Sequence, residues 1–227
     1  MYFSGIFTIA AKDLRAEWRT REAINASLAF SIAILVLFSF AFDPGNPDIK
    51  IKAVAAGLLW MTYAFAAALS LNRSFARELQ NDCLDALMAA PIPASALYLG
   101  KVLGNFALLL AMEIVSLGIF SFLYNVKVLP HIWELLLVIL LGTWAMTVMG
   151  TLFSALTVNL RLRELMLPIM TYPFLVPALM ASITLTDSLL NGMSLGGENT
   201  LWVKVLFGFD VVFTSLAVLL IDTVLVG

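Results

Sequence analysis

The chain has 227 residues, of which 62% are hydrophobic and 12% are charged, and its formal net charge is -2. Soluble globular domains carry about a quarter charged residues, so this composition, with a mean hydropathy of +0.99, indicates an integral membrane protein. The lack of a Lys/Arg-rich patch argues against nucleic-acid binding. The single cysteine excludes an intrachain disulfide and a metal site built from several cysteines.

Residues 1–22 are predicted to form an amphipathic helix that lies in the membrane interface. Apolar side chains recur on one helical stripe, and most charged side chains fall elsewhere; the stripe consists of Phe3, Phe7, Ala10, Leu14 and Trp18. A tryptophan at headgroup depth is typical of such helices. The charges follow the first apolar residues and precede the long apolar run, so we interpret this segment as mature structure rather than a signal peptide.

Six later stretches are long and apolar enough to cross a bilayer, which takes about 20 residues each. They cover approximately residues 24–42, 53–71, 101–124, 133–158, 165–186 and 202–226. The sequence therefore predicts an all-α polytopic membrane protein, with residues 1–227 forming one transmembrane permease domain. An even number of spans places both termini on one side of the membrane.

Between the second and third spans lies the longest polar-rich segment, 72–101, and within it residues 72–93 have the pattern of an amphipathic helix. Pro91 and Pro93 are expected to end this helix. It is predicted to be either a solvated connection resting on headgroups or a coupling helix that docks on a cytosolic subunit. The residues that would carry the coupling are Phe75, Arg77, Glu78, Leu79, Asp82, Cys83 and Leu87.

Three acidic residues fall inside predicted spans, where a charge is costly. Glu113 lies midway along the third span, and Asp210 and Asp222 lie in the sixth. They could form a proton relay or line a polar cavity, or they could be neutral carboxyl groups hydrogen-bonded between helices, with Asp222 near the cytoplasmic surface. His131, the single histidine, could be an axial haem ligand, but a lone interfacial histidine is more often a solvated surface residue.

The fifth span contains Pro168, Pro173 and Pro177, and it is therefore predicted to be kinked or locally broken. Small residues recur at helix-packing intervals elsewhere, as at Gly100 and Gly104 in the third span. Such residues let helices approach closely in lipid. We expect them to serve internal packing, with a dimer seam as the alternative.

Orientation follows from the distribution of Lys and Arg. With the N-terminus inside, nine of the thirteen basic residues lie in cytoplasmic segments. The other four, Lys50, Lys52, Lys127 and Lys204, lie outside the membrane or near its outer surface. The positive-inside rule therefore predicts that both termini and the 72–101 segment are cytoplasmic.

Two stretches of the chain carry a resemblance to a known family. Residues 72–101 contain RELQNDCLDALMAAPIP followed by a Gly-Lys pair, and residues 141–180 contain the run ALTV, a basic loop and a pair of prolines. In these features the chain resembles the haem exporter protein B family (CcmB), the membrane subunit of the cytochrome c maturation ABC transporter. The chain departs from the family at Asp82, where a glycine is common.

This resemblance implies a non-catalytic permease subunit in the bacterial inner membrane. Such a subunit would couple ATP hydrolysis by a separate cytosolic ATPase to haem export or to release of a haem-loaded chaperone, beside haem-handling membrane subunits. The chain lacks a phosphate-binding loop, which agrees with ATP binding on a partner. The resemblance also implies that no cofactor is bound directly, because the tryptophan-rich haem-handling signature of the partner membrane subunit is absent here. By analogy with other ABC half-transporters, we also expect a homodimer.

Two other functions are compatible with the same spans. A secondary transporter would show inverted repeats with matching broken helices, but only the fifth span has the sequence of a broken helix. A structural membrane adaptor would need neither the kinked span nor the coupling helix.

Overall fold

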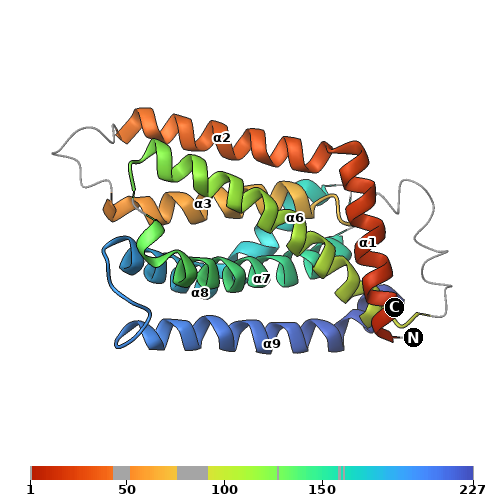
Figure 1. Ribbon diagram of the computed structural model, residues 1–227. Helices are drawn as coiled ribbons and strands as arrows, with labels where there is room; N and C mark the ends of the chain where they lie inside the picture. Colours follow the sequence, from red (N-terminus) through yellow and green to blue (C-terminus); the bar gives the residue numbers. More distant parts are fainter. Residues whose placement is uncertain are drawn as a thin grey trace.

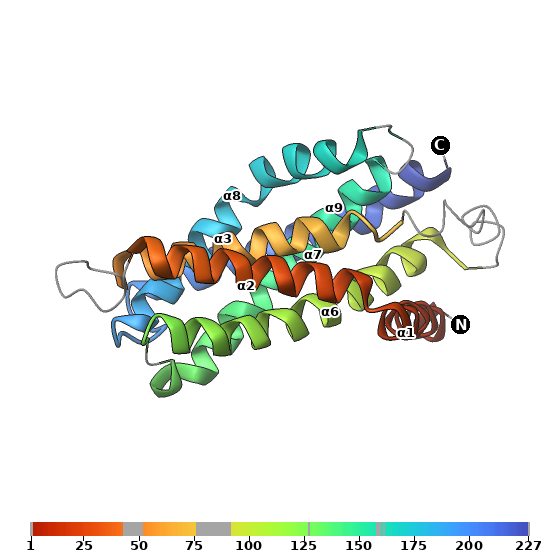
Figure 2. The ribbon, with the colours of Figure 1, turned by 90° about the horizontal axis from the view of Figure 1, so that it is seen from above.

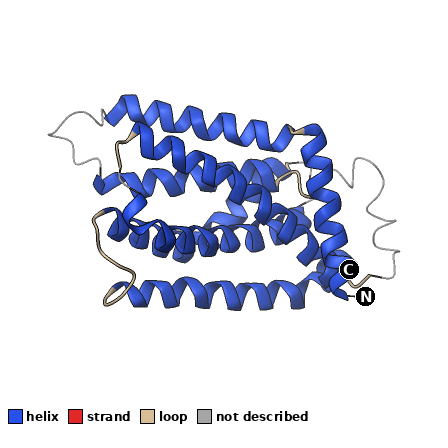
Figure 3. Cartoon of the chain, in the orientation of Figure 1, coloured by secondary structure: helices blue, strands red, loops and turns tan. Residues whose placement is uncertain are grey.

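A computed structural model of the chain describes residues 2–42, 52–75, 92–126, 128–157, 160 and 162–226. Within these ranges it contains helices joined by loops and turns and no strand, as Figure 3 shows. Its six longest helices run alongside one another, and the 19-residue N-terminal helix lies crosswise at one end (Figure 1). The long helices are α2 (Glu22–Phe42), α3 (Lys52–Leu71), α6 (Ala94–Leu123), α7 (Ile132–Thr157), α8 (Arg163–Leu190) and α9 (Asn199–Val226).

All six long helices have the length and apolar composition needed to cross a membrane, which confirms the predicted all-α fold with six spans. The largest difference concerns the third span. The sequence predicts a start at Lys101, whereas α6 begins at Ala94, directly after Pro93. The Pro93 backbone is extended, and its carbonyl accepts the first bonds of the helix from the N–H groups of Ala96 and Leu97. Lys101 is therefore inside α6 rather than at its end.

The spans are arranged around α3 and α7. In each of these two helices 72% of the most apolar window is buried, compared with 22 to 39% in the other four. Close packing at this centre depends on small residues, because a side chain at Gly142 would meet Trp60 of α3 and one at Gly150 would meet Leu71. In the described residues both glycines serve internal packing, which is the use predicted for the small residues of these spans, although the sequence pattern does not single out Gly142.

Tyrosine side chains connect neighbouring spans through backbone oxygens. Tyr63 donates to the carbonyl of Glu113 at 2.9 Å, Tyr98 to Val148 at 2.7 Å and Tyr172 to Ala64 at 3.0 Å. Tyr124, just beyond α6, donates to the carbonyl of Leu35 at 3.0 Å. A hydroxyl without a partner is costly in hydrocarbon, so these bonds both satisfy the tyrosines and fix the relative positions of the helices.

Helix α8 contains all three prolines of the fifth span and is nevertheless continuous. Figure 2 shows that it changes direction along its length. Pro168 has no N–H to donate to the carbonyl of Glu164, four residues earlier. The Asn72 side-chain amide, in the turn after α3, donates to that carbonyl at 3.4 Å, and this bond attaches the turn to the start of α8.

The crosswise helix is α1 (Tyr2–Thr20), which lies at the end of the bundle where both chain termini are found (Figures 1 and 2). Arg21 has a left-handed backbone, with φ of 55°, and turns the chain from α1 into α2. The buried Glu17 accepts hydrogen bonds from the N–H groups of Ala23 at 2.7 Å and Ile24 at 3.1 Å. A carboxylate at a helix N-terminus satisfies donors that have no partner within the helix, so Glu17 fixes the corner.

Candidate functional site

Helix α1 packs against the first turns of α6 at two glycines. A Cβ atom at Gly100 would lie 2.7 Å from the Cβ of Ile9 and 2.9 Å from the carbonyl oxygen of Ile6. One at Gly104 would lie 3.5 Å from the Cβ of Asp13. The absence of a side chain at Gly100 is therefore what allows the two helices to approach, and it brings Asp13 next to Lys101.

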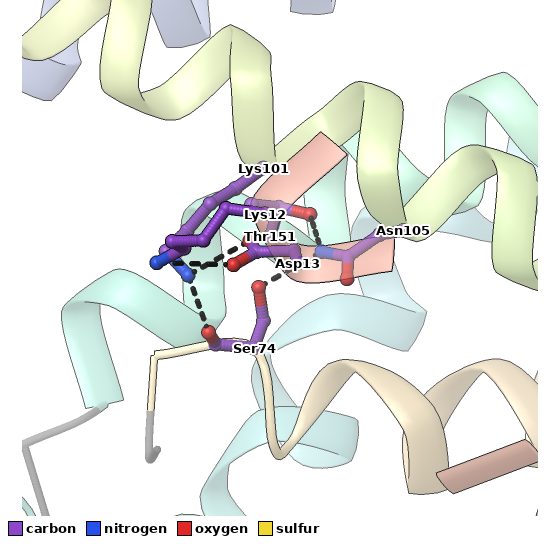
Figure 4. Close-up of polar contacts among 6 residues, drawn as sticks. All are labelled: Lys12, Asp13, Ser74, Lys101, Asn105 and Thr151. Carbon is purple, nitrogen blue, oxygen red and sulfur yellow. Dashed lines mark hydrogen bonds and ion pairs between the residues drawn. The ribbon is translucent and has the colours of Figure 1, made fainter. Parts of the chain in front are cut away.

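Lys101 is the centre of a polar cluster at this end of the bundle (Figure 4). Its side chain is only 1% exposed. The Nζ atom donates to the carbonyl oxygen of Ser74 at 2.7 Å, lies 3.3 Å from Oδ2 of Asp13, and lies 4.9 Å from the centroid of the Phe75 ring. A buried ammonium group is stable only when it is paired and hydrogen-bonded, and these contacts meet that need.

Asn105, one turn further along α6, extends the cluster to α7. Its Nδ2 atom donates to the hydroxyl of Ser74 at 2.8 Å and to the hydroxyl of Thr151 at 2.9 Å. We name the set formed by Asp13, Ser74, Phe75, Lys101, Asn105 and Thr151 the junction. It joins four parts of the chain, namely α1, the turn after α3, α6 and α7.

The junction lies where the predicted coupling segment leaves the bundle. Phe75 is the last described residue of the predicted 72–93 segment before 76–91, and residues 72–75 form a turn rather than the predicted start of a helix. The Phe75 ring is fully buried among Tyr98, Val102 and Val148. In this position Phe75 contacts the bundle and not an outside surface. The other predicted coupling residues, Arg77, Glu78, Leu79, Asp82, Cys83 and Leu87, lie outside the described residues, so their role stays a prediction.

The three intramembrane acids occupy different environments. Glu113 in α6 is buried and accepts a hydrogen bond from the hydroxyl of Thr143 in α7. Asp210 in α9 is 5% exposed, and Asp222 near the end of the same helix is exposed. Among the described residues no hydrogen bond or ion pair joins one of these acids to another. The relay and the neutral-carboxyl interpretations both remain predictions.

His131 ends a short 3-10 turn (Leu129–His131) between α6 and α7, and its Nδ1 atom lies 3.3 Å from Oε2 of Glu134. Within the described ranges, no group of three or more His, Cys, Asp or Glu residues is placed to hold a metal ion. An axial haem ligand needs no such group, so the haem-ligand and the solvated-surface interpretations of His131 both remain predictions.

Nothing in the sequence pattern marks Asp13, Ser74, Asn105 or Thr151 as members of a polar site, and a lysine at position 101 indicates only the end of a span. A partial signal was available at Gly100 and Gly104, which mark a close helix contact next to a lysine. The partner helix could not be identified from this spacing, because Asp13 and Lys101 are 88 residues apart.

Comparison with known proteins places the chain in a family. The family model described as CcmB protein matches residues 4–225. The chain is 32% identical to a protein named Heme exporter protein B from Rhodobacter capsulatus, over 75% of this chain and 77% of that protein.

Proteins of the same name in other bacteria give similar matches. The one from Paracoccus denitrificans is 30% identical over 74% of this chain and 76% of its own length. The one from Pseudomonas aeruginosa is 26% identical over 95% of both. With six helices able to span a bilayer and a family match along nearly its whole length, the chain is a multi-pass membrane protein that belongs to the CcmB protein family.

Proposed function

We propose that the chain is the membrane subunit of an ABC transporter in cytochrome c biogenesis. It would couple ATP hydrolysis by a separate cytosolic subunit to haem export or to release of a haem-loaded chaperone. Family membership and the name Heme exporter protein B of its relatives support this proposal. The chain has no phosphate-binding loop of its own, so the nucleotide has to bind to another chain.

The observation that carries the coupling role is the junction at the base of the 76–91 segment. A force on that segment would reach the bundle through Ser74 and Phe75 at one end and through Ile92 and Pro93, which precede α6, at the other. From Ser74 it passes through Lys101 to α1 and through Asn105 to α7. Because α7 is one of the two most buried spans, a movement at its end changes the centre of the bundle rather than its lipid-facing periphery.

The same proposal includes the setting of the complex. Two copies of the chain would pair with two ATPases, beside the membrane subunits that handle haem, in the bacterial inner membrane. Both termini and the 76–91 segment would face the cytoplasm, because most basic residues lie at that end. The chain would bind no cofactor directly and catalyse no reaction itself.

Leu79→Asp tests the docking of the ATPase. If Leu79 enters an apolar groove on the ATPase, an aspartate there has to lose its hydration on docking, which costs several kcal/mol. We expect the variant to insert at normal abundance and to lose the ATPase on co-purification, with loss of cytochrome c maturation.

Glu78→Ala is the comparison in the same segment, because the loss of any surface ion pair that Glu78 makes would cost only a few tenths of a kcal/mol. It should retain most of the ATPase. Full recovery of the ATPase with Leu79→Asp would show that this face only rests on headgroups, and the docking proposal would then fail.

A further inference from the structure

Helix α1 has three distinct faces, which follow from 3.6 residues per turn. The first face packs against the protein and includes Ile6, Ile9, Ala10 and Glu17, all of which are buried. It is held in place by the contacts with the glycines of α6 and by the hydrogen bonds that Glu17 accepts from the start of α2. This face fixes the rotation of the helix about its axis, so the direction of the other two faces is determined.

The second face is an apolar stripe that points away from the protein. Phe3 is 73% exposed, Phe7 is 66% exposed and Trp18 is 72% exposed. Aromatic side chains of this size are rarely left in water along one line of a helix. The helix also lies crosswise at the end of the bundle, beside the ends of α2 and α6 (Figures 1 and 2), and this is the level at which a membrane surface would lie.

The third face, beside the apolar stripe, is basic. Lys12, Arg15, Arg19 and the adjoining Arg21 are exposed, and the Arg21 guanidinium lies 5.5 Å from the centroid of the Trp18 ring. Both acids of α1 are turned toward the protein, where Glu17 caps α2 and Asp13 is paired with Lys101. Asp13 also pairs with Lys12 at 3.1 Å, so Arg15 and Arg19 carry the unneutralised charge of the basic face. Within the described part of the chain, no ion pair involves Arg15 or Arg19.

We propose that α1 is a docking surface for anionic phospholipids. Arg15 and Arg19 contact the headgroup phosphates, and Phe3, Phe7 and Trp18 enter the boundary between the headgroups and the acyl chains. The charge separation on α1 supports this partner, because turning both acids inward leaves an outward surface of positive charge next to an apolar stripe. Each basic residue near an anionic surface strengthens binding roughly fivefold. The inference does not depend on the proposed transport function.

The test uses the full-length protein in nanodiscs that contain a photoactivatable analogue of either phosphatidylglycerol or phosphatidylcholine. Mass spectrometry after digestion with a protease that does not cut at Lys or Arg measures the crosslinks within residues 2–20. We expect the wild-type ratio of phosphatidylglycerol to phosphatidylcholine crosslinks to be about tenfold or more. Arg15→Gln with Arg19→Gln should lower the ratio about tenfold or more, with Lys12 and Arg21 retaining part of the preference, and replacement of both by lysine should preserve the wild-type ratio.

Single variants supply a control of equal charge. Arg19→Gln should lower the ratio several-fold, whereas Lys204→Gln, at an exposed position in the first turns of α9, should leave it unchanged. A wild-type ratio near one, or an equal ratio in the double glutamine variant, would overturn the proposal. Loss of the preference in inorganic phosphate, but not in chloride of equal ionic strength, would also overturn it by showing a general anion site.

Discussion

The ammonium group of Lys101 is buried within the N-terminal part of α6, where it is shielded from water. The position is tolerated because the group has a carboxylate, a backbone oxygen and an aromatic ring as neighbours. Removal of one partner of a buried ion pair costs about 3 to 5 kcal/mol, whereas replacement of both by neutral side chains is often harmless. Loss of Asp13 alone should therefore cost more stability than loss of both charged groups together.

Asp13→Asn should lower the free energy of unfolding by about 2 kcal/mol, because it removes a carboxylate next to the buried ammonium group. The cost falls below that of a fully buried pair, since the Asp13 side chain is 23% exposed. Lys101→Met should cost less, because Asp13 keeps Lys12 at 3.1 Å. Thermal unfolding of the purified protein in mild detergent measures each change.

The double variant is the decisive measurement for this pair. Asp13→Asn combined with Lys101→Met should be more stable than Asp13→Asn alone, because no charged group is then left buried. If the stability losses of the two single variants simply add in the double variant, the two side chains do not interact. The ion pair would then make no contribution to holding α1 against the rest of the junction.

At the scale of elements, the packing of α1 against α6 depends on the glycine at position 100, which has no side chain. A methyl group at Gly100 would overlap Ile9 and would approach a backbone oxygen that cannot move without the helix. If α1 moved away from α6 to make room for the methyl group, Asp13 would also move away from Lys101. We therefore expect the position of α1 to be more sensitive to Gly100 than to any exposed residue of α1.

Gly100→Ala should reduce stability by about 1 to 3 kcal/mol, the usual cost of overpacking, and should make α1 more accessible to protease. Gly118→Ala in the same helix is the control, because a Cβ at Gly118 has nothing within 4 Å. Since alanine favours helix over glycine by up to about 1 kcal/mol, the control should be neutral or stabilising. Equal behaviour of the two variants would contradict the packing role of Gly100.

On the scale of the whole molecule, the described ends of α3 and α6 that flank residues 76–91 lie at the same end as both termini (Figure 1). The loop between α8 and α9 lies at the opposite end. Cys83, the single cysteine, is therefore a specific probe of orientation. The basic residues predict that its side of the membrane is the cytoplasm.

A membrane-impermeant thiol reagent should not label Cys83 in intact cells and should label it in inverted vesicles from which partner proteins have been washed. The control replaces Cys83 with serine and places the cysteine at the exposed Ser194, in the loop between α8 and α9. Ser194→Cys should show the reverse pattern. Labelling of Cys83 in sealed cells would place the termini outside and would remove the basis of ATPase coupling.

The sequence by itself determined the six spans and the amphipathic character of α1. Both are local properties, because about 20 consecutive apolar residues are enough to favour a bilayer crossing and a helical stripe needs only its own spacing. For the same reason the spacing of Phe3, Phe7 and Trp18 is sufficient to place them on one face of a helix. The family resemblance also required only local motifs, and the family match over residues 4–225 confirms it.

Which residues form the junction is decided only by the tertiary structure. A lysine near the start of an apolar run marks the end of a span when its neighbours are considered alone, because a charge in hydrocarbon is costly. Lys101 lies inside α6 instead, since Asp13, 88 residues earlier, and Ser74, 27 residues earlier, supply its partners. Contacts between residues so distant in the chain leave no periodic signal in the sequence, because they exist only after α1 has packed on Gly100 and the turn after α3 has reached α6.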